Sequence, residues 1–326
     1  MSFFDIYGHE RQIAILKKAM GQKRVGHAYL FSGIDAIGKR TLAGQFAKAL
    51  NCEKGDNLHD ACGKCSSCLK AQHSSHADMI FIEADGQFIR INAIREIKER
   101  MKFRPLEGRW RAVIIDDADK MNDHAANALL KTLEEPSASN ILILISSRPY
   151  SMPATIISRC RHMRFNPLPV NAVARFLVEQ KGMDEQKSGL LAGLSGGSIG
   201  RALELNEEDI STFRAEIMQL LMNTKKDDPF SLLNLASFVS QDKKKIKRGL
   251  DIISSCFRDA LIFKETRKKE MLINSDKSPF INILAQKLTG EQILQNIFLI
   301  ARAWETIEQN VNKTLTLETM AFKLNC

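Results

Sequence analysis

The segment 33–39, Gly-Ile-Asp-Ala-Ile-Gly-Lys, constrains the fold of this chain more than any other feature. Its spacing G-x-x-x-x-G-K is that of a phosphate-binding loop, in which Gly33 and Gly38 let backbone N–H groups converge on phosphate oxygens and Lys39 adds a positive charge. Such a loop needs a strand before it and a helix after it. The apolar run at 28–32 predicts the strand, and the pattern at 39–50 predicts the helix. We therefore expect an α/β domain around a phosphate loop.

The rest of the first half alternates short apolar runs with helical patterns, which is typical of a parallel sheet covered by helices. Further strands are expected at 79–82, 112–115, 141–146 and 163–165, and further helices at 10–20, 91–101 and 124–133.

The pattern changes after residues 166–169, because Pro167 and Pro169 break any regular element and no alternating run follows. Short helices are expected at 170–181, 185–194 and 198–205, and longer amphipathic helices include 246–263 and 291–311. These patterns predict three domains: an α/β domain at 1–166, a small helical domain at 167–207 and a helical bundle at 208–326.

The formal charge of +9 favours a polyanionic neighbour, and basic runs occur at 243–248 and 264–269. Solvated helix faces explain such runs as well as a surface near DNA does, so both interpretations stay open. No apolar run reaches the roughly 18 residues that a membrane-spanning helix needs, and the first residues lack the pattern of a signal peptide. We expect a cytoplasmic protein without a membrane partner.

The phosphate loop departs from the functional pattern at the position after Lys39. The Ser or Thr hydroxyl that ligates Mg²⁺ is expected there, yet the residue is Arg40, and Thr41 follows one position late. A shift of one residue turns a helical side chain by about 100 degrees, so Thr41 is not expected to reach the metal. Arg40 would hold phosphate electrostatically or fill the site when nucleotide is absent.

A second nucleotide-site pattern is the apolar strand 113–115 followed by Asp116 and Asp117. Asp116 stands where a Walker B aspartate organises Mg²⁺, whereas Asp117 is shorter than the glutamate that polarises the attacking water in active members of this class. The two departures together predict impaired hydrolysis.

Cys52, Cys62, Cys65 and Cys68 have the spacing C-x9-C-x2-C-x2-C, and the chain has seven cysteines in all. Thiolates at this spacing converge tetrahedrally on Zn²⁺, and a four-thiolate site leaves no open position, so we expect structural zinc in a module at 52–68. A redox pair or an iron–sulfur cluster is the alternative. The neighbouring histidines are expected to be exposed loop residues, and they are His59, His73 and His76.

These residues, with four further segments, carry a resemblance to a known family. The segments are Phe-Asp-Ile-Tyr-Gly at 4–8, His-Ala-Tyr-Leu-Phe at 27–31, the helix 127–136 that ends in Glu-Glu-Pro, and Ser-Arg-Cys at 158–160. The chain resembles the delta prime family of bacterial DNA polymerase III clamp-loader subunits, within the AAA+ ATPases. The likeness is specific over the first 205 residues and rests only on helical character and length beyond them.

The resemblance implies a role for several residues. Arg159 would be an arginine finger that acts in trans on the ATP of a neighbouring subunit, although a local salt bridge is the alternative. Ser146 falls at the polar sensor position, with strand-end capping as its alternative. A second sensor has arginine in hydrolysing subunits where this chain has Gly200, which is a third departure from an active site.

The resemblance also implies a heteropentamer with tau/gamma ATPase subunits and a delta subunit, joined by the C-terminal collar domain, that loads the sliding clamp onto primer-template DNA. Its domain at 167–207 would be the AAA+ lid. ATP or ADP would be possible in the loop but not required. The alternatives are an active AAA+ ATPase of the tau/gamma type, and a zinc-dependent DNA-binding module, which the few basic residues near the cysteines disfavour.

Overall fold

The computed structural model describes residues 2–54, 60–85, 88–207, 210–309 and 311–325. The chain divides into two compact units, of which the first comprises residues 1–176 and 197–201 and the second comprises residues 177–196 and 202–326. Each unit is described by itself.

The first unit contains a sheet of five parallel strands in the order β2-β3-β4-β1-β5. The strands are β1 (Ala28–Ser32), β2 (Met79–Ile82), β3 (Arg111–Ile115), β4 (Asn140–Ser146) and β5 (Arg161–Arg164). β1, β3 and β4 are buried along their whole length, as expected for strands covered on both faces. The predicted fold class, a parallel P-loop sheet with flanking helices and a helical C-terminal part, is confirmed.

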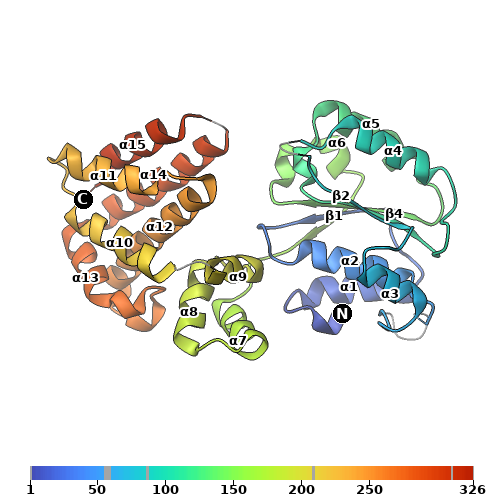
Figure 1. Ribbon diagram of the computed structural model, residues 1–326, viewed down its shortest axis with the longest axis horizontal. Coiled ribbons are helices and arrows are strands. Elements are labelled where there is room, and N and C mark those ends of the chain that lie inside the picture. The colour runs from blue at the N-terminus through green and yellow to red at the C-terminus, as the bar shows by residue number, and fades with distance from the viewer. Residues whose placement is uncertain (1, 55–59, 86–87, 208–209, 310, 326) are drawn as a thin grey trace. The chain divides into compact units, whose positions relative to one another are not determined.

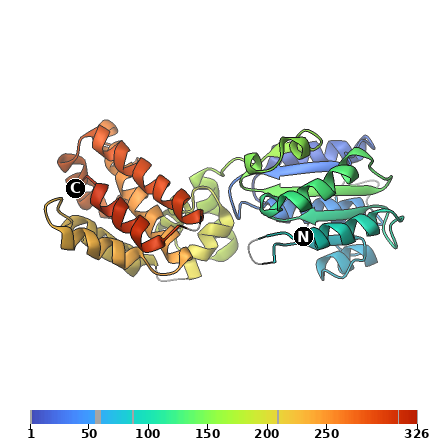
Figure 2. The ribbon, with the colours of Figure 1, turned by 90° about the horizontal axis from the view of Figure 1, so that it is seen from above.

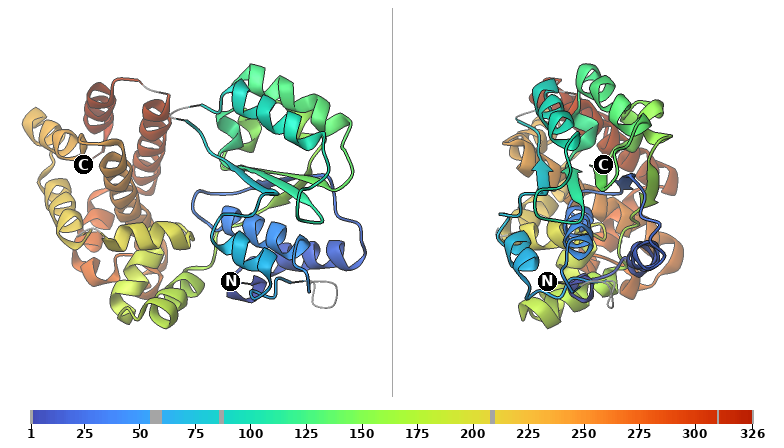
Figure 3. Two further views of the ribbon diagram at one scale, coloured as in Figure 1. Left: turned by 45° about the vertical axis from the view of Figure 1, so that its right-hand side comes forward. Right: turned by 90° about the vertical axis from the view of Figure 1, so that its right-hand side faces the viewer.

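Helices cover both faces of this sheet (Figures 1 and 3). Side chains that alternate along the strands build two cores: Phe31 and Ile114 pack with Leu42 on one face, and Leu30 and Val113 belong to the core of the other face. One face is covered by α1 (Glu10–Gly21), α2 (Lys39–Leu50) and α3 (Ser66–Gln72), and the other by α4 (Ile91–Met101), α5 (Asp123–Glu134) and α6 (Ala154–Ile157).

The predicted strands agree with the structure, except that the last one lies at Arg161–Arg164 and not at 163–165. This strand is a sheet edge whose side chains are mostly exposed, so the apolar pair Met163 and Phe165 marked only its end. The sequence patterns also missed the short α3, which follows the third cysteine of the module.

The second unit is helical (Figure 2). Within it, α12 (Lys243–Thr266) packs against α13 (Ser278–Lys287) and α14 (Gly290–Glu308), and α11 (Pro229–Val239) packs against α15 (Lys313–Lys323), so the predicted bundle is formed. Two helices, α7 (Val170–Lys181) and α9 (Ile199–Glu207), contribute residues to both units, so the three-domain division stays a prediction. The second unit also contains α8 (Glu185–Leu194) and α10 (Ile210–Asn223).

Across the described ranges, none of the helices combines the length and the apolar composition that crossing a membrane requires.

Candidate functional site: a phosphate loop with an internal cation

The phosphate loop connects β1 to α2 and depends on its glycines. Gly33 has φ +154° and Gly38 has φ +106°, backbone conformations that side chains rarely adopt. A Cβ on Gly33 would lie 2.4 Å from the carbonyl oxygen of Phe165, so the close approach of these two backbones requires glycine. The sequence therefore keeps the backbone of a phosphate site.

Lys39 is turned onto its own loop. Its Nζ donates hydrogen bonds to the carbonyl oxygens of Gly33 at 2.5 Å and Ile34 at 2.8 Å. Burial lowers the pKa of Lys39 below its ordinary value, against the raising effect of nearby carboxylates, of which Asp35 has the largest. In this arrangement the loop carbonyls hold the ammonium group that would otherwise meet a phosphate.

Arg40 contacts two acidic residues, of which Asp116 is predicted to organise a metal ion. Its Nη1 is 3.2 Å from Oδ2 of Asp116, and its Nη2 pairs with the carboxylate of Glu83, which follows β2. Burial alone would lower the pKa of Arg40, but the hydrogen bonds and charges of Glu83 and Asp116 raise it above its ordinary value. The guanidinium carbon also lies 5.5 Å from the centre of the Phe81 ring. A protein cation therefore stands beside Asp116, the carboxylate that the sequence predicts to organise Mg²⁺.

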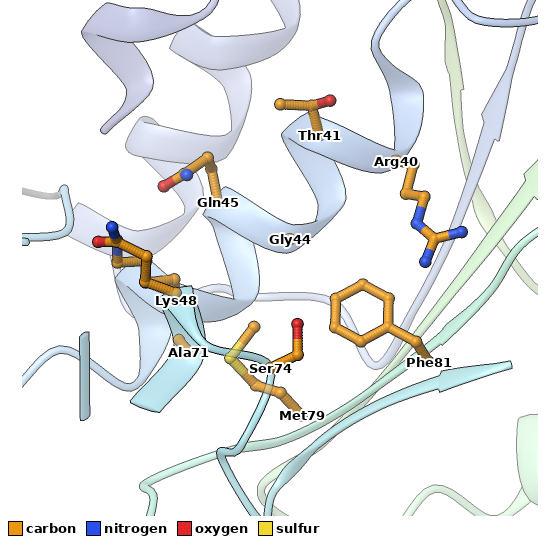
Figure 4. A pocket seen from close by; sticks show the side chains of 10 residues that line it. Arg40, Thr41, Gly44, Gln45, Lys48, Ala71, Ser74, Met79 and Phe81 are labelled. Carbon is orange, nitrogen blue, oxygen red and sulfur yellow. The ribbon is translucent and has the colours of Figure 1, made fainter. Parts of the chain in front are cut away.

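Thr41 does not share this position. Figure 4 shows Arg40 and Thr41 leaving α2 in different directions, with Arg40 reaching toward Phe81. Thr41 is exposed and, like Arg40, lines a cavity beside α2.

The remaining acidic and polar candidates are divided between different partners. Asp117 has φ +49° and its Oδ2 lies 2.7 Å from Nζ of Lys120. The fully buried Ser146 donates a hydrogen bond to Oδ1 of Asp119 at 2.5 Å. Asp119 also lies 3.6 Å from Nε of Arg148. Ser146 and Asp119 therefore form one hydrogen-bonded pair, and Arg40 and Asp116 form a separate ion pair.

Sequence reasoning missed Glu83 and Asp119 as members of this site. Asp119 stands three positions after Asp116 in the same acidic run, so the sequence could have indicated it. For Glu83 the sequence offered one signal, its position directly after a predicted strand.

The residues at 197–201 close over the phosphate loop within the first unit. Ser198 Oγ donates to the carbonyl oxygen of Asp35 at 3.0 Å, and the amide of Gly200 donates to the carbonyl oxygen of Ala36 at 3.1 Å. A Cβ on Gly200 would lie 2.7 Å from that oxygen and 2.8 Å from the Cβ of Ala36. The position where a second sensor would carry arginine is thus in direct backbone contact with the loop.

Arg159 follows α6 and is 37% exposed along its side chain. Its Nη2 lies 2.9 Å from Oε1 of Glu134 at the end of α5, and its Nη1 donates to the carbonyl oxygen of Thr155 at 3.0 Å. Exposed ion pairs of this kind contribute roughly 0–1 kcal/mol, so this contact holds the side chain only weakly.

The four predicted cysteines of the module come together. All four Sγ atoms lie within 4.8 Å of one another, with 4.0 Å between Cys52 and Cys65 and 3.9 Å between Cys62 and Cys68. Sulfur atoms bound tetrahedrally at about 2.3 Å from Zn²⁺ are about 3.8 Å apart, so the cluster has the dimensions of a metal site.

The surrounding backbone supports ligation. The amide of Cys62 donates to Sγ of Cys52 at 3.3 Å, and the amides of Cys65 and Cys68 donate to Sγ of Cys62 and Cys65 at 3.4 Å. Backbone N–H groups of Lys64 and Cys65 lower the pKa of Cys62 to about 6, whereas burial raises the pKa of Cys52 and Cys68. The cluster can bind a metal ion.

The expectation for the neighbouring histidines was wrong for His76. This side chain is buried, with its Nε2 3.1 Å from Ser67 Oγ, and its Nδ1 accepts a hydrogen bond from the amide of Asp78 at 3.1 Å. His73 is exposed as expected, and His59 lies outside the described residues.

Comparison with known proteins connects this architecture with bacterial replication. The family model described as DNA polymerase III, delta subunit, matches residues 8–169, and the model of its C-terminal part matches residues 210–325. DNA polymerase III subunit delta' of Bacillus subtilis is 29% identical over 320 residues, which cover 96% of this chain and 95% of the relative.

A second relative is the DNA polymerase III gamma subunit of Buchnera aphidicola subsp. Schizaphis graminum. It is 31% identical over 263 residues, which cover 78% of this chain and 71% of the relative. Among solved structures, a gamma subunit-related protein from Thermotoga maritima matches with a TM-score of 0.43 and 19% identity, covering 96% of this chain and 99% of that one.

Proposed function

Because the chain belongs to the DNA polymerase III delta subunit family of clamp-loader proteins, we propose that it is a delta prime-type subunit that does not hydrolyse ATP itself. It assists catalysis at the ATP site of a neighbouring subunit. It would work in the cytoplasm.

The pairing of Arg40 with Asp116 carries the first half of this proposal. The guanidinium lies where the Walker B carboxylate would meet Mg²⁺, and the hydroxyl that would complete the metal's ligands is absent from position 40. Lys39 is held by the loop carbonyls, so any bound ATP or ADP would lack a well-placed metal ion. Nucleotide is thus possible at Gly33–Lys39 but not required.

Two further residues support the loss of hydrolysis. The Asp117 carboxylate is paired with Lys120, which competes with a water molecule for its oxygens. Gly200 leaves no room for a sensor side chain beside Ala36. Ser146, which the family pattern places at a sensor position, would hold Asp119 in place through its hydrogen bond to that carboxylate.

Arg159 carries the second half of the proposal. We assign it the role of an arginine finger that stabilises negative charge on the γ-phosphate bound to a neighbouring subunit. Its exposure leaves it available, since its surface ion pair with Glu134 and its hydrogen bond to the carbonyl oxygen of Thr155 would be exchanged for a phosphate at little cost.

The family supports a proposal for the partners. We propose a heteropentamer with tau/gamma ATPase subunits and one delta subunit, in which 1–166 is the AAA+ domain, 167–207 the lid and 208–326 the collar. The assembly would place the sliding clamp on primer-template DNA. The relatives named delta' and gamma support this assignment.

We assign structural zinc to Cys52, Cys62, Cys65 and Cys68. A closed site of four thiolates leaves no position for water, so zinc would stiffen the module that includes α3 and would take no part in catalysis.

The second candidate, an active ATPase of the tau/gamma type, is favoured by the retained Gly33, Gly38 and Lys39. ATP hydrolysis by the purified chain, measured with and without Mg²⁺, separates the two. Our proposal predicts no turnover above a control without protein. Mg²⁺-dependent turnover of roughly one per second or faster, an ordinary rate for an enzyme, would establish the alternative.

A further inference from the structure

A cavity of about 330 Å³ lies between α14 and α15 in the helical second unit. The two helices pack against each other (Figure 1). They run antiparallel, because two hydrogen bonds of 2.8 Å join the side chain of Asn296, near the start of α14, to the backbone of Asn325, just after the end of α15. The volume is at the lower end of the roughly 300–1,000 Å³ that is usual for sites of small organic ligands. The proposed clamp-loader role assigns nothing to this cavity.

The end of the cavity near the connection between the two helices is apolar. Thr306 of α14 and Leu315 of α15 are each ten residues from the contact between Asn296 and Asn325, which is about 15 Å along the helix axes. Leu315 is 61% exposed, and Val311, just before α15, is 45% exposed. Both line the cavity, so a ligand that covered them would gain the free energy of removing this apolar surface from water.

The bottom of the cavity is apolar as well. It is formed by Ala303 of α14 and Met320 of α15, which line the cavity and are otherwise buried. The half-buried Leu299 continues this surface along α14. A methionine side chain adapts its shape to an irregular neighbour, so this surface can accommodate an aliphatic chain.

The other end of the cavity carries two cations, Arg302 of α14 and Lys323 of α15. They are six and two residues from the contact between Asn296 and Asn325, or about 9 Å and 3 Å along the helix axes, and both are exposed. Neither side chain makes an ion pair or a hydrogen bond with another residue in the described part of the chain, and none of the described residues that line the cavity is acidic. Their long, flexible stems allow both cationic groups to meet a single anion.

We propose that this cavity binds an anionic amphiphile with one aliphatic chain, the chemistry of a free fatty acid. The carboxylate lies between Arg302 and Lys323, and the chain extends over Met320 toward Leu315. A neutral apolar compound would leave both cations without an anion, and a small inorganic anion would leave Leu315 in water. The two ends of the cavity together therefore select a molecule that has both chemical characters.

Equilibrium dialysis of the full chain against labelled decanoate, below the concentration at which decanoate forms micelles, tests the apolar end of the site. We expect saturable binding that Leu315→Ser weakens about fivefold, because part of the leucine surface is already buried without a ligand. Phe230→Ser is the matched control. Phe230 is an exposed apolar residue of α11 that does not line the cavity, so this variant should bind like the unmodified chain.

The cationic end is tested in the same assay. Arg302→Gln should weaken decanoate binding about tenfold, the usual effect of losing a hydrogen bond to a charged group. Lys287→Gln, which removes an exposed cation of α13 away from the cavity, is the control and should leave binding unchanged. Decanol, which has the same chain and no charge, should bind more weakly than decanoate, and added salt should weaken the binding of decanoate alone.

The proposal is overturned if decanoate does not bind saturably, if decanol binds as tightly as decanoate, or if either control weakens binding as much as the variant it is matched to. Leu315 and Arg302 are exposed, so both variants should keep the melting curve of the unmodified chain. Should one of them fail to fold, the other decides the matter.

Discussion

The Nη1 atom of Arg40 lies 3.2 Å from Oδ2 of Asp116, so two residues 76 positions apart bring a guanidinium against the carboxylate that we propose as the metal-organising one. In the proposed function, this side chain holds the position that a metal ion would take at the phosphate loop.

Replacing Arg40 by threonine should restore the missing hydroxyl and free Asp116. We expect Arg40→Thr to bind ATP roughly tenfold more tightly with Mg²⁺ than without, since metal sites commonly change affinity by this factor when a supporting group is altered. Filter binding of labelled ATP measures it. Thr41→Ala is the control and should leave binding unchanged, and an equal response of both variants would contradict the role given to Arg40.

Gly200→Ala should destabilise the chain, because the new Cβ would lie 2.7 Å from the carbonyl oxygen of Ala36. Overpacking of this kind costs about 1–3 kcal/mol. Gly189→Ala is the matched control in α8, where a Cβ meets nothing within 4 Å, and it should be neutral or stabilise by about 0.5–1 kcal/mol. Urea denaturation compares them, and an equally stable Gly200→Ala would refute the close contact.

Much of this fold was predictable, because the periodicities that define it are local. The strand at 28–32 and the helices at 39–50 and 91–101 begin and end where the apolar patterns do. The last strand was misplaced because its side chains are mostly exposed, and α3 was missed because it has only seven residues.

The sequence predicted most of the residues of the candidate site, but not Glu83 or Asp119 and not the contacts between its members. The sequence contains the arginine at position 40 and the glycine at position 200, but it does not reveal that Arg40 reaches Glu83 and Asp116 or that Gly200 touches Ala36. These are contacts between distant segments, which the spacing of residues does not encode. For the same reason His76 was expected in solvent and is instead buried against Ser67.

Cys65→Ser should abolish metal binding at the cysteine cluster, because four thiolates close the site and three do not. Zinc content measured by atomic emission should fall from about one equivalent to none, and the thermal midpoint should fall with it. Cys160→Ser, an isolated half-buried thiol, should keep the metal. A Cys65→Ser chain that stays folded but loses affinity for DNA would instead make the module a DNA reader.

Asp78 and Arg111 form a buried ion pair of 3.1 Å, and Asp78 also accepts hydrogen bonds from the amides of Leu106, Glu107 and Gly108. Removing one partner of such a pair costs about 3–5 kcal/mol, so Asp78→Asn should lower the free energy of unfolding by an amount of that order. Chemical denaturation at neutral pH measures the loss.

The same pair predicts a pH dependence. Burial would raise the pKa of Asp78, but the hydrogen bonds from Glu107, Gly108, Leu106 and Arg111 hold it below its ordinary value. Its contribution to stability is therefore complete above about pH 4, the ordinary range for this group, and is lost as the pH falls through the depressed value. Asp78→Asn should lack this component, and an unchanged acid profile would contradict the assignment.

The most direct test is the ATPase activity of the reconstituted clamp loader with Arg159→Ala in this subunit. We predict that turnover at the neighbouring site falls by about 10³-fold or more, with assembly unchanged on gel filtration, as when other arginine fingers are removed. Glu134→Gln, which only releases the surface ion pair, should keep full turnover. Normal turnover with Arg159→Ala would contradict the account.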